Sequence, residues 1–447
     1  MEDVDGDAAV GGRTVSGVIP HPPKTADRVA ALLPPCFFAP AIVAFAAALA
    51  AAPALLDDVH DHFYQAHVLA LVHTLTLGWI SMVMIGVLYR YVAGLTKVPV
   101  PRPRAAVAQW ATYVTGTTAL VTGFWTGDWA LTAGAAGMLA VSVVLLATNL
   151  WPMLAASPKR GVAEVGIALA TAFFFAAAVL GTLLAVDKMQ PFLRGHVLTN
   201  LGAHAHLAGL GWVGTTIAAL AFRFLPAFLF ASLDLTAAAR RIVVVLAGGV
   251  VLLAATLLAG GGTAPAAAVV ATTLAVWVVQ VVRMLRSHRL PFDWTTRHAM
   301  AAVAWCATAI VLGIALVGTG LARDGGPQLA AAYGTAGLLG WMSNLVVGIS
   351  YKLFPGFVVA TRTALGRRPI PITVLLVPAP LQIFVFVAFN AGTAAVVASL
   401  LTGNAPAGIA GAVALAAAAV AYAAATARTL LRTATDPPPW SPLEVLP

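Results

Sequence analysis

The residues in this chain best suited to chemistry are its histidines. Seven of the ten histidines fall into two stretches, each followed by a Gly-Trp pair. The first stretch contains His60, His62, His67 and His73, and the second contains His196, His204 and His206. Neutral imidazole is a common ligand for haem iron, copper and zinc. The two stretches therefore predict a bound metal or haem, with these seven histidines as the candidate ligands.

The Gly-Trp pairs belong to a longer string that occurs three times. In each copy a Gly-Trp pair and nine further residues precede an aromatic residue and a basic one. The copies are 78–90, 211–223 and 340–352. His73 and His206 both stand five positions before the glycine, where the third copy has Thr335. Histidine at two of three equivalent positions predicts a site between repeated units, with its third position vacated.

The composition places these strings in membrane-spanning helices. The chain is 60% hydrophobic and 9% charged over 447 residues, with a mean hydropathy of +0.92. Apolar stretches of about 20 residues cross a bilayer as helices, which satisfy their own backbone hydrogen bonds. We therefore expect an all-α integral membrane protein with twelve spans. They are 35–56, 65–92, 105–126, 129–155, 162–186, 196–224, 241–262, 264–284, 299–321, 328–353, 371–401 and 405–431.

The basic residues predict how these spans are oriented. Only Lys188, Arg194 and Arg323 fall on one side of the expected topology, and the other 22 of the 25 lysines and arginines fall on the opposite side. The positive-inside rule then places both termini in the cytoplasm. We expect the membrane to be a bacterial-type inner (plasma) membrane. The net charge of +9 reflects this topology and contact with anionic lipid, so we expect no nucleic-acid partner.

The spacing of the strings predicts three units of four helices each. Gly78 and Gly211 are 133 residues apart, and Gly211 and Gly340 are 129 apart. The strings fall in spans two, six and ten, which run in the same direction. The expected membrane domain is 35–433, with units near 35–160, 161–290 and 291–433. A polar cytoplasmic segment (1–34) precedes it, and a cytoplasmic tail (434–447) follows.

Helical geometry limits how the histidines combine. At about 100° per residue, His204 and His206 point to opposite sides of their helix, so together they cannot hold one metal. Each can instead supply one ligand to a site in a neighbouring cleft, with span two completing one of the sites. His60 and His67 share a face, as do His62 and His73 if the helix already runs at residue 60. The remaining histidines, His21, His288 and His298, are expected to be solvated.

These features resemble the catalytic subunit I of the haem–copper oxidase superfamily. The resemblance is carried by the helix count, the three units, the string Ala203-His204-Ala205-His206-Leu207 and the segments 222–226 and 351–355. The chain is also similar to oxidase-like and NnrS-like proteins that lack parts of the oxidase centre. The resemblance implies b-type haem, with copper possible, held by His73, His206, His204 and His67. It also implies a separate electron-donor protein or a second subunit.

The departures from that family limit the expected activity. The His-x-His motif lies on span six, whereas in the oxidases it lies on helix ten, where this chain has Tyr333 and Thr335. We therefore expect electron transfer, gas binding or reduction of a small molecule such as nitric oxide, and not proton-pumping oxygen reduction. One alternative is a transporter or metal-handling permease with a histidine-lined path. Another is a degenerate relative that binds no cofactor.

Overall fold

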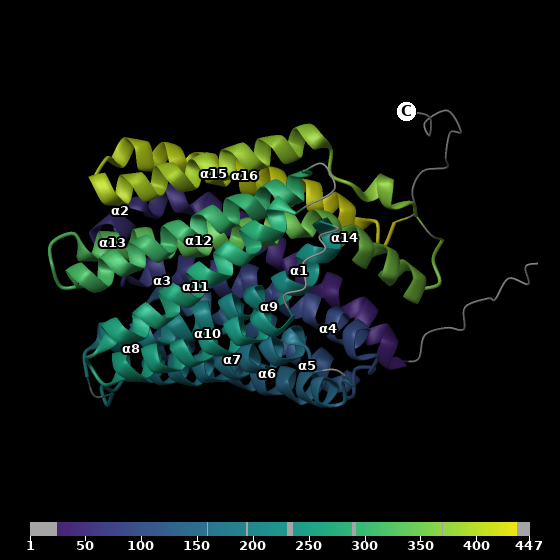
Figure 1. The fold of residues 1–447 in the computed structure, drawn as a ribbon, viewed down its shortest axis with the longest axis horizontal. Coiled ribbons are helices and arrows are strands. Elements are labelled where there is room, and N and C mark those ends of the chain that lie inside the picture. The colour runs from purple at the N-terminus through teal and green to yellow at the C-terminus, as the bar shows by residue number, and fades with distance from the viewer. Residues whose placement is uncertain are drawn as a thin grey trace, which may run out of the picture.

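A computed structural model describes residues 25–435 apart from 159, 194, 230–235, 288–291 and 369, and all regular structure in this part is helical. Twelve long helical segments form an elongated bundle (Figure 1). Nine are single helices: α1 (Thr25–Ala51), α5 (Pro103–Thr126), α6 (Trp129–Ala155), α7 (Val162–Asp187), α10 (Thr236–Leu258), α11 (Thr263–Arg286), α12 (Trp294–Thr319), α15 (Ala379–Thr402) and α16 (Ala405–Leu431). The other three are composite, and each contains one of the repeated strings.

The composite segments share one construction. An α-helix leads into eight residues of π-helix, and a second α-helix follows. They are α3 (Ala66–His73) with α4 (Met82–Thr96), α8 (Val197–His206) with α9 (Thr215–Leu229), and α13 (Gly326–Thr335) with α14 (Asn344–Ala364). Their π-helical turns are Thr74–Ser81, Leu207–Gly214 and Ala336–Ser343. Such turns are rare and are often found at functional sites. Each begins directly after His73, His206 or Thr335, so the repeated sequence forms a repeated structure.

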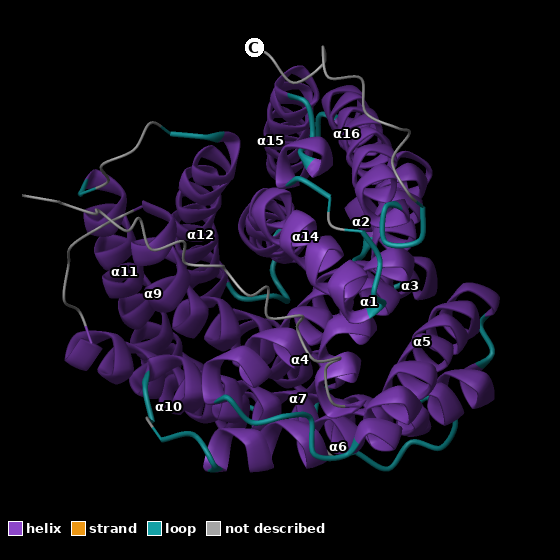
Figure 2. Cartoon of the chain, turned by 90° about the vertical axis from the view of Figure 1, so that its right-hand side faces the viewer, coloured by secondary structure: helices purple, strands orange, loops and turns teal. Residues whose placement is uncertain are grey.

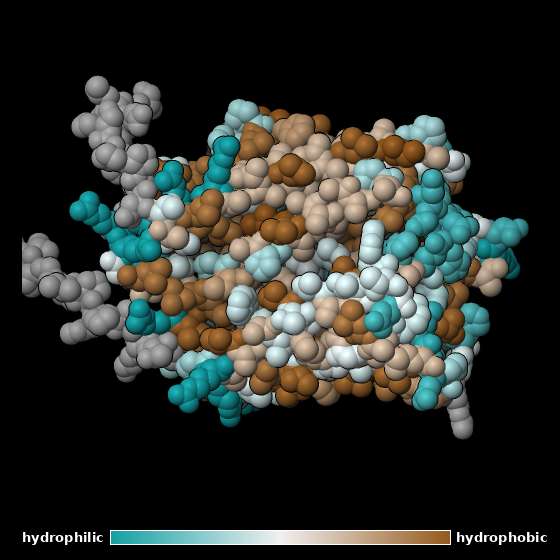
Figure 3. All heavy atoms as spheres, turned by 180° about the vertical axis from the view of Figure 1, so that it is seen from behind, coloured by the Kyte–Doolittle hydropathy of each residue, from teal (hydrophilic) through white to brown (hydrophobic). Residues whose placement is uncertain are grey.

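The expectation of an all-helical fold is confirmed for the described residues, and the helices are compatible with a membrane protein. Among the described residues, eleven helical segments are long and apolar enough to cross a membrane. The twelfth long helix, α5, is 24 residues long but richer in threonine. An apolar band separates more polar residues at the two ends of the bundle (Figure 3). Several expected boundaries were wrong: α1 begins at Thr25 and continues through Pro34 and Pro35, α12 begins at Trp294, and α14 continues to Ala364.

The units close into a ring. The last helix of each unit packs against the first helix of the next: α6 on α7, α11 on α12 and α16 on α1. Viewed along the bundle, α1, α4 and α14 lie near the middle, and α5, α6, α10, α11, α15 and α16 lie around the outside (Figure 2). The three π-helical turns also contact one another. The repeated strings therefore meet around a common centre.

Small residues allow these central helices to approach closely. The glycine of each Gly-Trp pair lies against the first helix of its own unit. A Cβ at Gly78 would be 2.9 Å from the Ala44 Cβ, and one at Gly211 would be 2.7 Å from the Phe173 ring. At Gly340 it would be 2.5 Å from the Trp305 ring. These contacts explain why glycine occurs in all three copies.

We expect Gly340→Val to destabilise the protein by about 1–3 kcal/mol, because the added side chain overlaps the Trp305 ring. Unfolding in detergent, followed by circular dichroism, measures the loss. Gly337→Ala is the matched control, since an added Cβ at Gly337 meets nothing within 4 Å. Equal stability of the two variants would show that the close packing at Gly340 is unimportant.

Two ends of the bundle are used as landmarks below. The "basic end" is where α4 and α14 finish, and where α1 begins and α16 ends (Figure 1). The "histidine end" is the opposite end, where α3, α8 and α13 begin. Arg362, which lies beyond the expected span 328–353, is fully buried in α14 at the basic end. Its guanidinium donates hydrogen bonds to the backbone carbonyls of Arg368, Arg432 and Thr435, and so ties α14 to the end of α16.

Candidate haem or metal site

The structure brings two of the candidate histidines together between the first two units. His73, the last residue of α3, and His204, on α8, face each other with ring centroids 6.3 Å apart and planes 24° from parallel. Their sequence separation, 131 positions, is close to one repeat. His73 and His206 were the first candidates from the sequence, because they occupy the same position of the repeated string. The structure instead pairs His73 with His204.

Backbone hydrogen bonds fix the tautomer of both rings. The Nδ1–H of His73 donates to the Leu69 carbonyl at 2.7 Å, and that of His204 donates to the Ala177 carbonyl at 3.0 Å. Because a carbonyl only accepts, the proton must be on Nδ1, and Nε2 keeps its lone pair. A metal-binding histidine is typically oriented in this way, through its other ring nitrogen. Both imidazoles are therefore prepared to act as ligands.

Neighbouring helices hold the pair in place. The Phe124 ring of α5 stacks on His73 with centroids 4.9 Å apart. On the other side, Gly181 of α7 lies directly against His204, and a Cβ there would be 2.8 Å from the ring carbon Cε1. Sequence reasoning missed Gly181, because no local pattern links it to a residue 23 positions away. A bulkier residue at position 181 would push the His204 ring out of its position.

A second pair with the same geometry lies between units two and three. His206 of α8 faces Tyr333 of α13 with ring centroids 6.1 Å apart and planes 25° from parallel. The Nδ1–H of His206 donates to the Gly202 carbonyl at 2.7 Å, as His73 does to Leu69. Its Nε2 is 3.4 Å from the Tyr333 hydroxyl. His204 and His206 thus face different interfaces, as their 200° separation predicted.

Both pairs use the same two positions of the repeat. In each pair, one residue stands five positions before the Gly-Trp glycine of its own unit. It faces the residue that stands seven positions before the Gly-Trp glycine of the next unit. For the interface between units three and one, these positions are Thr335 and Leu71. At these two positions the first interface therefore has two imidazoles, the second an imidazole and a phenol, and the third neither an imidazole nor a phenol.

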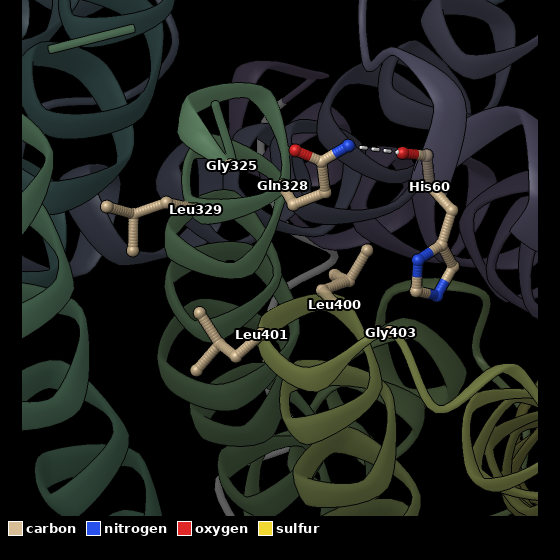
Figure 4. Close-up of a pocket in the computed structure, with 7 residues that line it drawn as sticks. All are labelled: His60, Gly325, Gln328, Leu329, Leu400, Leu401 and Gly403. Carbon is tan, nitrogen blue, oxygen red and sulfur yellow. Dashed lines mark hydrogen bonds between the residues drawn. The ribbon is translucent and has the colours of Figure 1, made fainter. Parts of the chain in front are cut away.

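The other candidate histidines lie apart from the His73–His204 pair. His60, in α2 (Leu56–Asp61), borders an open pocket of about 430 Å³ formed with the start of α13 and the end of α15 (Figure 4). Its Nε2 is 2.9 Å from the Ser399 hydroxyl, and its backbone carbonyl accepts a hydrogen bond from Gln328. These polar partners tie α2 to α13 and α15 at the histidine end.

His62, His67 and His196 lie at the surface or in turns. The chain is extended at His62, between α2 and α3, so the condition under which His62 and His73 would share a helical face is not met. The Nδ1 of His67 is 3.5 Å from the Asp58 carboxylate, and the ring is about half exposed. His196 caps α8 by accepting a hydrogen bond from the Leu198 N–H.

His298 was wrongly expected to be solvated. It lies one turn into α12 and is fully buried. Its Nδ1 is 2.5 Å from Asn344 Oδ1, and the amide of Asn344 donates to Asn390 Oδ1 at 2.7 Å. Trp305 donates to the same Asn390 oxygen at 3.1 Å. The tryptophan at 294 and the apolar run after 298 were the signals that the helix begins earlier than expected. His288 and His21 lie outside the described residues.

This polar network should stabilise unit three. We expect Asn344→Leu to cost about 1–3 kcal/mol, because it leaves the buried Nδ1 of His298 without its partner and removes one of the two donors to Asn390 Oδ1. Denaturation in detergent measures this cost. The double variant Asn344→Leu with His298→Leu should recover part of it, because both members of the bond are then apolar. An unchanged stability in Asn344→Leu would contradict the importance of the network.

The basic residues that close the strings lie at the basic end, far along their helices from the paired histidines. The Lys352 ammonium is 2.7 Å from the carboxylate of Asp293, which caps α12. Burial raises the pKa of Asp293, but the Lys352 ammonium and the hydrogen bonds from Thr296 outweigh it and hold that pKa below its usual range. Stability from this pair is therefore present above the ordinary carboxyl pKa and is lost as the pH falls below it.

Comparison with known proteins adds no family to this geometry. No protein-family model matches the chain, and no curated protein sequence is similar to it. Within the described part of the chain, histidine, cysteine and carboxylate side chains form no group of three or more suited to a metal ion. The candidate site is thus defined by the His73–His204 pair and its repeat-related partner, His206–Tyr333.

Proposed function

We propose that this protein binds haem between its first two units, where His73 and His204 would hold the iron. The observation that carries the proposal is the pair of facing imidazoles, each with a bonded Nδ1 and a free Nε2. Metal–nitrogen bonds of about 2 Å on each side, together with the size of the rings, require centroids roughly 6 Å apart. The observed separation of 6.3 Å agrees with this requirement.

The side chains around the pair suit a b-type haem. Phe124 and Gly181, which lie against the two rings, are both apolar. The imidazoles are neutral and therefore need no counter-charge. When bound, haem supplies one-electron redox chemistry and, where a coordination position is open, the binding of small gases. The chain orients the two ligands through the backbone carbonyls of Leu69 and Ala177. We therefore assign electron transfer to this pair.

The second pair supports gas binding or reduction of a small molecule such as nitric oxide. A neutral phenol is a weaker ligand than an imidazole, so a metal held by His206 would keep a replaceable position on its Tyr333 side. Copper or a second haem iron is compatible with this donor set. A separate electron-donor protein or a second subunit would then deliver the electrons.

The proposed setting is a bacterial inner membrane with both termini in the cytoplasm. The unequal distribution of lysine and arginine between the two sides of the expected topology supports this orientation. On this basis the histidine end is the extracytoplasmic one. The three repeated strings and the twelve long helices also support a divergent, oxidase-like relative of the haem–copper oxidases, without the complete oxidase centre.

Haem and metal analysis of the purified protein tests this function against the alternatives. After growth with ample haem, we expect non-covalent b-type haem at one or more per chain, identified as its pyridine complex. A metal-handling permease would instead contain zinc or copper without haem. A folded preparation with neither would favour the degenerate relative and overturn the proposal.

A further inference from the structure

An open pocket at the histidine end has a lining that includes none of the paired histidines. Its volume is about 430 Å³, and it lies where the end of α2, the start of α13 and the end of α15 meet (Figure 4). Leu329, Leu400 and Leu401 form its apolar side, and His60 and Gln328 are its polar side chains. Pockets that bind small molecules are typically apolar with a few polar groups, and their volumes begin near about 300 Å³. This pocket therefore has the size and the mixed lining of a site for a small amphiphilic molecule.

The hydrogen bonds of His60 leave one of its ring nitrogens as an acceptor. The Ser399 hydroxyl donates its single proton to the Asn404 carbonyl at 2.8 Å. His60 Nε2, which is 2.9 Å from the same hydroxyl oxygen, must therefore carry the ring proton and donate it. Nδ1 then keeps its lone pair and has no partner among the residues that the structure describes. This nitrogen is not buried, and it faces Leu400 and the other lining residues (Figure 4). A donor group inside the pocket can therefore reach it.

Further groups of the pocket also accept hydrogen bonds. The amide nitrogen of Gln328 donates to the His60 carbonyl at 2.8 Å, so the amide oxygen points the opposite way and is accessible (Figure 4). Leu400 and Leu401 belong to the last turn of α15, and the last carbonyls of a helix have no partner within the helix. The pocket thus offers several acceptors to a ligand that donates hydrogen bonds.

The charges around the pocket favour a positively charged donor. Three of the six residues of α2 are aspartates, and His60 is the only other titratable residue of that helix. The start of α13 adds the positive end of a helix dipole, whereas the end of α15 adds a negative end, so these two contributions oppose each other. Arg323 and Asp324, which precede the lining residue Gly325, also offset each other. The aspartates of α2 therefore give the surroundings a net negative charge.

We propose that this pocket binds an organic ammonium ion, a protonated amine with a short hydrocarbon part, whose N–H donates to His60 Nδ1. An ammonium group only donates, which matches a ring nitrogen that only accepts. The hydrocarbon part would lie on Leu329, Leu400 and Leu401, where burial of apolar surface adds to the affinity. The site is independent of haem, because none of its lining residues belongs to either histidine pair.

Three matched probes test the ligand class with protein in lipid nanodiscs, in mildly alkaline buffer. Benzylammonium has both the charge and the N–H donors, benzyltrimethylammonium keeps the charge without a donor, and benzyl alcohol keeps a donor without the charge. Saturation-transfer difference NMR measures their binding, and empty nanodiscs give the contribution of the lipid. We expect saturable binding of benzylammonium and at least about fivefold weaker binding of each analogue. Equal binding of either analogue, or no saturable binding of benzylammonium, would overturn the proposal.

His60→Ala tests the acceptor. It removes Nδ1, so benzylammonium should bind at least about fivefold more weakly, whereas benzyltrimethylammonium, which cannot make this hydrogen bond, should bind as before. His196→Ala, at the cap of α8, is the matched control and should change neither. An equal loss for both probes in His60→Ala would show that the variant only disturbs the pocket, and would overturn the assigned hydrogen bond.

A pair of charge variants at Leu401 tests the place of binding and the sign of the ligand charge. Leu401 lines the pocket near the end of α15 and is 49% exposed, so it tolerates either substitution. Leu401→Arg should weaken benzylammonium binding by electrostatic repulsion, and Leu401→Glu should strengthen it. Benzylammonium binding that is the same in the two variants would show that the cation binds elsewhere.

Discussion

His204→Ala is expected to abolish the low-spin haem spectrum of this protein. The substitution removes one of the two imidazoles that face each other across the first interface, so haem held there would lose one of its two ligands. We expect the sharp alpha band of the reduced protein to disappear and haem affinity to fall by at least about tenfold. Added imidazole should restore much of the band, because it can occupy the space that the side chain leaves.

Two control variants separate this pairing from the one suggested by the repeat. His206→Ala removes the partner of Tyr333 but leaves His73 and His204 in place, so the low-spin band should remain. His196→Ala changes only the exposed cap of α8 and should also retain it. Loss of the band in His206→Ala, with retention in His204→Ala, would show that the repeat-equivalent pair His73–His206 holds the haem.

The second large effect is expected from Gly181→Val, which leaves every histidine in the chain. The added side chain overlaps the His204 ring, because even a Cβ at this position would be 2.8 Å from Cε1. The ring must shift away from the Ala177 carbonyl and from His73. Positioning changes next to a metal ligand typically reduce metal affinity by about 10–100-fold, and we expect a loss of haem in this range.

Haem titration of the purified apoprotein measures this loss, and Gly137→Ala on α6 serves as its control. An added Cβ at Gly137 meets nothing within 4 Å. Circular dichroism must show that Gly181→Val is folded, so that reduced binding reports the site itself. Haem affinity equal to that of the unmodified protein would contradict the role assigned to His204.

Much of the fold could be predicted from the sequence, because membrane spans depend on local composition. The twelve apolar stretches and the threefold string are visible without a structure. The opposite directions of His204 and His206 also follow from helical spacing alone. The extended residue His62 lies between two of the expected spans, 35–56 and 65–92, but the sequence left open whether a helix already runs at residue 60. The π-helical turns were missed, since eight residues with helical composition do not reveal their hydrogen-bond pattern.

The site was harder to predict, because it depends on contacts between units. Repeat equivalence placed His73 and His206 at the same level but could not show which helices are neighbours. In the closed ring, the residue seven positions before the Gly-Trp glycine of a unit faces the preceding unit. The residue five positions before that glycine faces the following unit. His73 therefore meets His204, while His206 meets Tyr333. The burial of His298 was missed for a similar reason, since its partners Asn344 and Asn390 lie on other helices.

The most direct test of the central claim is the low-temperature electron paramagnetic resonance spectrum of the oxidised, haem-replete protein. Two imidazole ligands from His73 and His204 should give a low-spin ferric signal, which disappears in His73→Ala and in His204→Ala. The reduced-minus-oxidised optical spectrum should show the matching sharp alpha band. A colourless, folded protein, or a low-spin signal that persists in both variants, would contradict the assignment of this pair as the haem ligands.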